Sequence, residues 1–252
     1  MNNFLDIKNI VKSYKGEAGS KLLVLDKVSF STSKDDYITT ILAPNGSGKT
    51  TLLKIISGLD YDYEGNILLS GNKIVNKFPF IPEKPSSFYW LNVEENIKTV
   101  FMMLEESDKT IRYKLQELID LTGLTGYEKH FPDNKSYGFR FRISLARAIA
   151  VSSELILLDD PFKLMDGETK EELFQLIERI SKEKEIRFLI ASSNIPDAFR
   201  LSERILLITN NPLSEVIDIS ADKNIKGTEH IKNQIKSFLD NVDVFNKTNF
   251  SI

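Results

Sequence analysis

The sequence predicts an α/β fold in which a mostly parallel sheet core is joined to an antiparallel N-terminal β part and carries an inserted α-helical subdomain. Three observations predict it. Short, wholly apolar runs alternate with helical stretches, as buried parallel strands do in such folds. Two segments near the N-terminus alternate apolar and polar residues, which is typical of half-buried strands. The middle third of the chain, about 86–150, follows a helical period instead.

The N-terminal β part is predicted from residues 4–11 and 22–30, which alternate around the polar turn 15–21. Residues 64–75 predict a further pair of strands that turn at Ser70-Gly71. This part of the chain is therefore expected to form hairpins.

Four apolar runs predict the strands of the core, at residues 37–42, 155–158, 186–192 and 204–209. A helix is expected over 50–58, with Gly58 at the position of a C-terminal cap. An amphipathic helix is expected over 173–180. The order of strands and helices indicates a doubly wound sheet.

The first helix of the insertion is expected to begin near Asn92, which forms a capping-box pattern with Glu95 three residues later. After about residue 215 the chain becomes polar and rich in Asn and Lys. We therefore expect a nucleotide-binding domain over 1–215, with its helical subdomain at about 86–150, and a C-terminal tail over 216–252. Within the tail, residues 231–239 predict one short helix that packs on the domain.

A phosphate-binding loop is predicted between the strand 37–42 and the helix that follows it. Gly46 and Gly48 let the backbone curl so that its N–H groups point at phosphate oxygens, and the start of the helix adds a favourable dipole. Lys49 supplies a positive charge for the β- and γ-phosphates, and the Thr50 hydroxyl is expected to ligate Mg²⁺. This context is that of a P-loop on a RecA-like core. The residues expected to hold the nucleotide here are Ala43, Pro44, Asn45, Gly46, Ser47, Gly48, Lys49, Thr50 and Thr51.

Ala43 replaces the first glycine of the P-loop pattern, which alanine tolerates if its φ stays negative. The partner of the loop is expected at the end of the apolar run 155–158. Asp159 follows that run and would hold Mg²⁺ through a water molecule. Asp160 is the next residue, at the position of a general base for the attacking water.

Bulk composition excludes several classes of protein. The chain has 33 basic and 36 acidic residues, a balance that argues against a dedicated nucleic-acid surface, so no nucleic acid is expected as a partner. It has no cysteine, which excludes disulfides and thiolate metal sites. No apolar run approaches the roughly 20 residues that span a bilayer, so any membrane partner must supply the span.

Together these motifs resemble the ABC transporter ATP-binding subunits over about residues 4–210. Residues 81–97 are similar to the Q-loop region of the nitrate, sulfonate and taurine importer ATPases. Residues 135–150 are similar to the signature motif and its helix. The resemblance implies that Tyr14 stacks on adenine, and that Ser136 and Gly138 touch ATP bound to an opposite subunit. It also implies that Asp166 takes the D-loop position.

Three single residues and the signature motif depart from the family pattern. Asp160 stands for the catalytic glutamate, Ser193 for the switch histidine and Glu83 for the Q-loop glutamine, where it remains a candidate Mg²⁺ ligand. In the signature motif, Tyr137 and Phe139 replace a glycine and a glutamine. The shorter side chain of Asp160 retracts its carboxylate by roughly an ångström, which can lower a rate on the order of 100-fold.

The resemblance implies an ATPase that uses ATP and Mg²⁺ and works as a homo- or heterodimer with transmembrane permease subunits. Its expected location is cytoplasmic, at the inner face of the cell membrane. Because the binding residues are retained while hydrolytic residues are altered, we expect slow or asymmetric hydrolysis. The alternative is a non-catalytic, ATP-gated regulatory subunit paired with a consensus ABC ATPase. The resemblance implies that Phe88, Tyr89 and Trp90 form part of the contact with the permease. The competing interpretation is that Trp90 is buried within the helical subdomain.

Overall fold

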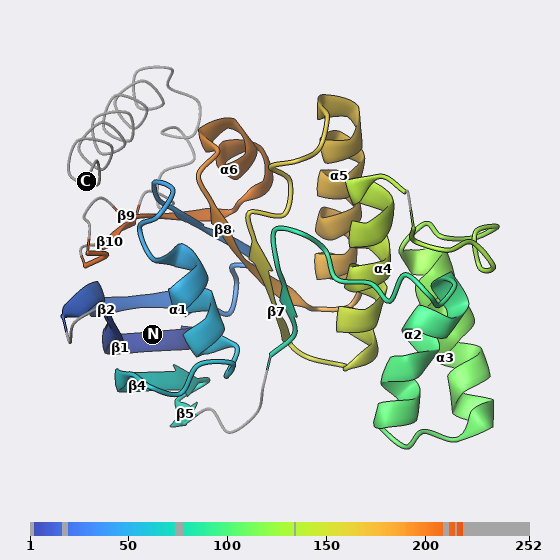
Figure 1. Cartoon of the computed structure of the whole chain (residues 1–252), viewed down its shortest axis with the longest axis horizontal. Coiled ribbons are helices and arrows are strands. Elements are labelled where there is room, and N and C mark those ends of the chain that lie inside the picture. Colours follow the sequence, from blue (N-terminus) through green and yellow to red (C-terminus); the bar gives the residue numbers. More distant parts are fainter. Residues whose placement is uncertain are drawn as a thin grey trace. The chain divides into compact units, whose positions relative to one another are not determined.

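The computed structural model describes residues 3–16, 20–73, 78–133, 135–208, 212–214 and 216–218. It divides into two compact units, one of Met1–Phe78 with Leu189–Ile252 and the other of Pro79–Phe188. The α/β class is confirmed, with antiparallel strands near the N-terminus, parallel pairs of core strands, and helices between them (Figure 1). The helix expected over 231–239 lies outside the described residues.

The N-terminal strands form a four-stranded sheet in the order β2-β1-β4-β5. Its strands are β1 (Asn3–Lys15), β2 (Lys21–Ser33), β4 (Glu64–Leu69) and β5 (Asn72–Lys73). Ser70 and Gly71 both have positive φ angles, of 47° and 82°, as a tight hairpin turn between β4 and β5 requires. The β1–β2 pairing extends to Lys15 and Lys21, beyond the apolar pattern, because polar residues also pair through their backbones.

Strand β3 (Ile38–Leu42) lies between β9 (Arg204–Ile208) and β8 (Arg187–Ser192), and β8 belongs to the same unit from Leu189 on. The β3–β9 pair is parallel, and every residue of β3 is buried, as its apolar run predicted. The short strand β10 (Val216–Asp218) pairs antiparallel with β9, so the first residues of the expected tail belong to a sheet. Helices α1 (Lys49–Ile56) and α6 (Ile195–Leu201) also belong to this unit, and α6 packs through Ala198.

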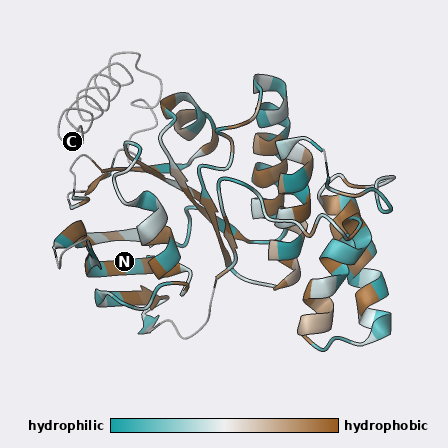
Figure 2. Cartoon of the chain, viewed as in Figure 1, coloured by the Kyte–Doolittle hydropathy of each residue, from teal (hydrophilic) through white to brown (hydrophobic). Residues whose placement is uncertain are grey.

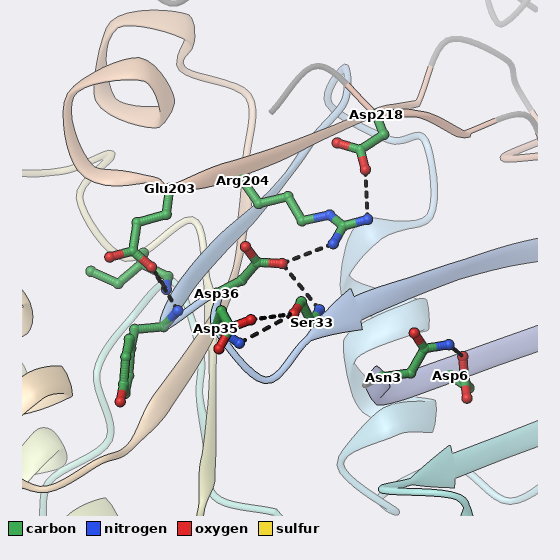
Figure 3. A network of polar contacts seen from close by, with 10 residues as sticks. Asn3, Asp6, Ser33, Asp35, Asp36, Glu203, Arg204 and Asp218 are labelled. Carbon is green, nitrogen blue, oxygen red and sulfur yellow. Dashed lines mark hydrogen bonds and ion pairs between the residues drawn. The ribbon is translucent and has the colours of Figure 1, made fainter. Parts of the chain in front are cut away.

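Charged side chains tie these strands together at one end (Figure 3). The guanidinium of Arg204, at the start of β9, donates to Asp36 at 2.8 Å and to Asp218 of β10 at 2.5 Å. Asp36 also accepts from the backbone N–H of Ser33, and the Glu203 carboxylate accepts from the N–H of Tyr37 at 2.6 Å. These contacts hold the turn between β2 and β3 against the start of β9.

The second unit contains the parallel pair β6 (Phe80–Ile81) and β7 (Leu155–Asp159). Its helices are α2 (Val93–Met103), α3 (Asp108–Leu121), α4 (Tyr137–Ala150) and α5 (Gly167–Glu183). The first three lie within the segment 86–150 that the sequence marked as helical. The predicted capping box is present at the start of α2. Figure 2 shows hydrophobic and hydrophilic residues side by side along α2, α3 and α5, as amphipathic helices require.

Candidate functional site

The predicted phosphate loop connects β3 to α1, and two glycines shape it. Gly46 and Gly48 have φ angles of 78° and 104°, in a region that side-chain-bearing residues rarely adopt. A Cβ atom on Gly48 would lie 2.8 Å from Val24 Cγ1, so the loop also passes too close to β2 for a side chain at this position. Ala43 is not among the described residues with a positive φ, and its N–H donates to the Ser192 carbonyl. Ala43 therefore avoids the positive φ that would have required glycine at this position.

Lys49 is the first residue of α1 and its side chain is buried. Its ammonium donates to the carbonyls of Ala43 and Pro44, both at 2.9 Å, so the cation is held inside the curl of the loop. The Ser47 hydroxyl is buried and has no hydrogen-bond partner among the described residues. A buried cation and an unsatisfied hydroxyl in one loop fit an anionic ligand that would accept hydrogen bonds from both.

Two further predicted site residues belong to the same unit. Tyr14 lies on β1, and its hydroxyl is 3.3 Å from Thr51 Oγ1 in α1, so the ring is attached to the helix that follows the loop. It is 40% exposed and is thus not a core tyrosine. Ser193 follows β8 directly and is half-buried, and the next residue, Asn194, caps α6.

The acidic pair Asp159-Asp160 ends strand β7 in the other unit. Both residues are buried, and Asp160 has a φ of 42°, a left-handed conformation that is unusual for a residue with a side chain. Such conformations gather at functional sites. The backbone turns sharply at the position predicted for the general base.

Glu83 forms an ion pair that the sequence did not predict. Its carboxylate lies 3.3 Å from the ammonium of Lys163, in the segment that follows Asp160. Both side chains are partly exposed, so the pair contributes little to stability. The negative charge introduced at the Q-loop position is thus accompanied by a positive charge within the same unit.

Ser136 caps the N-terminus of α4 by accepting from the backbone N–H of Phe139 at 3.2 Å. A Cβ atom on Gly138 would lie 2.5 Å from Thr169 in α5, so glycine is required there for close packing of the two helices. The ring of Tyr137 lies 4.5 Å from the guanidinium carbon of Arg140, one turn along α4. Its side chain packs against its own helix.

Asp166 caps α5, and the backbone N–H and hydroxyl of Thr169 donate to its carboxylate. These hydrogen bonds lower the pKa of Asp166 below its usual range. The observed role of this carboxylate is therefore that of a helix cap.

The segment before α2 presents aromatic rings on a fixed loop. The buried Asn96 side chain accepts from the N–H of Phe88 and donates to the carbonyls of Phe88 and Leu91. Arg147 of α4 stacks 4.6 Å from the Phe88 ring. Trp90 is 59% exposed, so it is not buried within the helical subdomain.

The predicted site residues are thus divided between the two units. The first holds Tyr14, which is predicted to stack on adenine, the predicted phosphate loop and Ser193. The second holds Glu83, Ser136, Gly138, Asp159 and Asp160. Sequence reasoning missed Lys163 as the partner of Glu83 and Thr169 as the neighbour of Gly138, because both contacts depend on how segments far apart in the sequence pack together.

Among the helices that the structure describes, none combines the length and the hydropathy that a membrane-spanning segment requires. Comparison with known proteins then identifies the family. A family model described as ABC transporter matches residues 25–163. An aliphatic sulfonates import ATP-binding protein of Bacillus cereus, SsuB, is 34% identical over 207 residues, which are 81% of each chain.

An uncharacterized ABC transporter ATP-binding protein of Methanocaldococcus jannaschii, MJ0412, is 30% identical over 228 residues, 87% of this chain and 83% of that protein. Among solved structures, the dimeric structure of MJ0796, a bacterial ABC transporter cassette, is similar with a TM-score of 0.70 at 25% identity. It covers 83% of this chain and 94% of that one. By its sequence and its fold, the chain belongs to the family of ABC transporter ATP-binding proteins.

Proposed function

We propose that this ATP-binding subunit holds MgATP in the loop 43–51, pairs with a second ATPase subunit, and hydrolyses ATP slowly to drive an importer. The observation that carries the proposal is the phosphate loop, with its left-handed glycines and the buried cation of Lys49 at the start of α1. The positive end of a helix and a lysine ammonium favour bound phosphate. The similar sulfonate import protein supports the direction of transport.

We assign Mg²⁺ to Thr50, Asp159 and Glu83. Hydroxyl and carboxylate oxygens are the ligands that Mg²⁺ prefers, and it usually takes only one or two carboxylates alongside the phosphates of a substrate. The proposed set of one hydroxyl and two carboxylates fits this mode. When bound, Mg²⁺ would neutralise charge on the phosphates. The protein residues orient the nucleotide around it.

Slow hydrolysis is proposed from the residues that would act on the attacking water. Asp160 would orient and deprotonate it, but its carboxylate is one methylene shorter than that of the family glutamate. Ser193 would donate a hydrogen bond to the γ-phosphate, but it reaches less far than histidine and carries no positive charge. Electrostatic stabilisation of this kind contributes several kcal/mol to phosphoryl transfer, so its weakening lowers the rate strongly.

The dimer is proposed from the N-terminus of α4. Ser136 is exposed there, and with Gly138 it would contact the γ-phosphate of ATP bound to the other subunit. The similarity to a dimeric ABC transporter cassette supports this arrangement. A heterodimer would differ from a homodimer in its hydrolytic residues, because its second subunit could supply a consensus glutamate and histidine at one of the two ATP sites.

The permease contact is proposed at the aromatic loop before α2. Tyr89 and Trp90 are 66% and 59% exposed, and the loop that carries them is pinned by Asn96. Exposed aromatic side chains on a preorganised backbone are suited to a protein interface. Through this contact the chain would reside in the cytoplasm, on the inner face of the cell membrane.

The hydrolysis proposal is tested by restoring the family residues. We expect Asp160→Glu combined with Ser193→His to raise the steady-state ATPase rate of the transporter, purified with its own subunits, by about ten- to a hundredfold. Asp108→Glu is the matched control, since Asp108 is an exposed residue at the start of α3. It should leave the rate unchanged.

Two results would contradict the proposal. One is a wild-type turnover equal to that of a consensus importer ATPase, and the other is an unchanged rate after both restorations. A purified complex that contains a second, consensus ATPase, and in which the double variant has no effect, would favour the regulatory function instead.

A further inference from the structure

A buried lysine lies beneath the tyrosine assigned to the adenine site. Lys12 is only 4% exposed, and its ammonium lies 4.9 Å from the centroid of the Tyr14 ring. The two residues are separated by one position in β1, and alternate residues of a strand point to the same face. The ammonium donates to Asp60 Oδ1 at 2.9 Å and to the Asp62 carbonyl at 2.6 Å.

The same cluster fixes the edge of the ring. The Tyr14 hydroxyl lies 3.3 Å from Thr51 Oγ1 and donates to Asp60 Oδ2 at 3.5 Å. Asp60 therefore receives hydrogen bonds from both Lys12 and Tyr14. Because Thr51 belongs to α1, the ring is tied to the helix that carries Lys49.

The lysine keeps its charge in this position. Burial by itself would lower the pKa of Lys12, but the hydrogen bond and the negative charge of Asp60 more than offset it and raise the pKa. Burial likewise opposes ionisation of Asp60, yet the hydrogen bond from Lys12 lowers the pKa of that carboxyl. A charged ammonium thus lies under the ring at neutral pH.

We propose that Lys12 is a positioning residue for the nucleotide base, holding and polarising the Tyr14 ring so that the opposite face of the ring receives adenine. This inference rests on the proposed function, in which Tyr14 stacks on the base. A cation over one face of an aromatic ring is attracted by its π electrons and draws them toward itself. The opposite face then repels the π electrons of a stacked base less.

Immobilisation of the ring adds to this effect. An exposed tyrosine that rotates freely loses that freedom when a ligand stacks on it, whereas a ring already held by Lys12, Asp60 and Thr51 does not. The arrangement affects only ligands that carry a base. A ligand that consists of phosphates alone would bind to the loop 43–51 and gain nothing from Lys12.

This difference between ligands provides the test. We expect Lys12→Met to weaken the binding of MgATP to the purified full chain by about three- to tenfold, by removing the cation from beneath the ring. Binding of magnesium tripolyphosphate, which has the phosphates without the base, should be unchanged. Lys12→Arg, which retains a cation, should bind MgATP like the wild type. Lys8→Met is the matched control, because Lys8 is an exposed lysine on the same strand.

The double variant Lys12→Met with Asp60→Asn removes both charges of this ion pair together. It leaves only the solvent-exposed carboxylate of Asp62 without its lysine, so it provides a folded reference. It should show the same selective loss of MgATP affinity. Equal weakening of both ligands by either Lys12 variant, or no weakening of MgATP, would overturn the role of Lys12. A wild-type chain that binds neither ligand would instead contradict the proposed function itself. The same conclusion would follow if the Lys49→Ala variant bound both ligands as tightly as the wild type does.

Discussion

At the scale of single residues, substitutions of Gly46 and Gly48 test the backbone conformation and the packing of the loop 43–51. Both have a left-handed backbone, but a Cβ on Gly46 would meet no atom within 4 Å, whereas one on Gly48 would crowd Val24 and Leu25. Gly46→Ala should therefore lower the free energy of unfolding by about 1–2 kcal/mol through backbone strain alone. Gly48→Ala should lower it by about 1 kcal/mol more, because of overpacking.

Urea unfolding of the two alanine variants checks this prediction. Equal losses of stability would show that the loop does not pass as close to β2 as the structure indicates.

Contacts of single side chains also accompany two residues that depart from the family pattern. Glu83 pairs with Lys163, and Tyr137 stacks on Arg140, so two departures from the family pattern are each accompanied by a charged neighbour. The Glu83–Lys163 contact does not follow from spacing in the sequence, since the two residues are far apart along the chain, whereas Tyr137 and Arg140 lie three residues apart on one helix. The substitutions were visible in the sequence, but Lys163 as the partner of Glu83 required the fold.

At the scale of elements, the loop before α2 depends on one buried amide. The Asn96 side chain bonds to the backbone of Phe88 and to the carbonyls of Leu91 and Asn92. Asn96→Ala would leave these backbone groups unsatisfied. It should lower the free energy of unfolding by about 1–3 kcal/mol and accelerate hydrogen exchange in residues 86–92.

Lys98→Ala, at an exposed position on the same helix, is the control and should change neither quantity. Unchanged exchange in Asn96→Ala would mean that the loop is held by other contacts, such as those of Arg147.

Most elements followed from local sequence patterns. The apolar runs located β3, β7, β8 and β9, and Ser70-Gly71 located the β4–β5 turn, because burial and turn geometry each restrict residue type locally. The strand β10 was assigned to the tail, since three residues are too few to show a strand pattern in the sequence, and this strand is identified by its pairing with β9 and by the Arg204–Asp218 contact. Likewise, exposure of Trp90 could not be decided from the sequence, as an aromatic residue suits a core and an interface equally.

At the scale of the whole molecule, the residues proposed for binding and those proposed for hydrolysis belong largely to different units. The loop proposed to bind phosphate and the ring proposed for adenine lie in one, while the carboxylates proposed for Mg²⁺ and the attacking water lie in the other. Binding of the phosphates is therefore expected to depend on the first unit, and hydrolysis on residues of both. For this reason, nucleotide affinity and ATPase rate should respond to different substitutions.

The central claim is that the curl of residues 43–51 around Lys49 binds MgATP. Isothermal titration calorimetry of the purified chain with MgATP tests it most directly, with Lys49→Ala as the variant and Lys54→Ala, an exposed lysine of the same helix, as the control. Loss of a charged hydrogen-bond donor to phosphate should weaken binding by about ten- to a hundredfold in Lys49→Ala, while Lys54→Ala binds like the wild type. Undiminished affinity in Lys49→Ala, or no binding by the wild-type chain, would contradict the account.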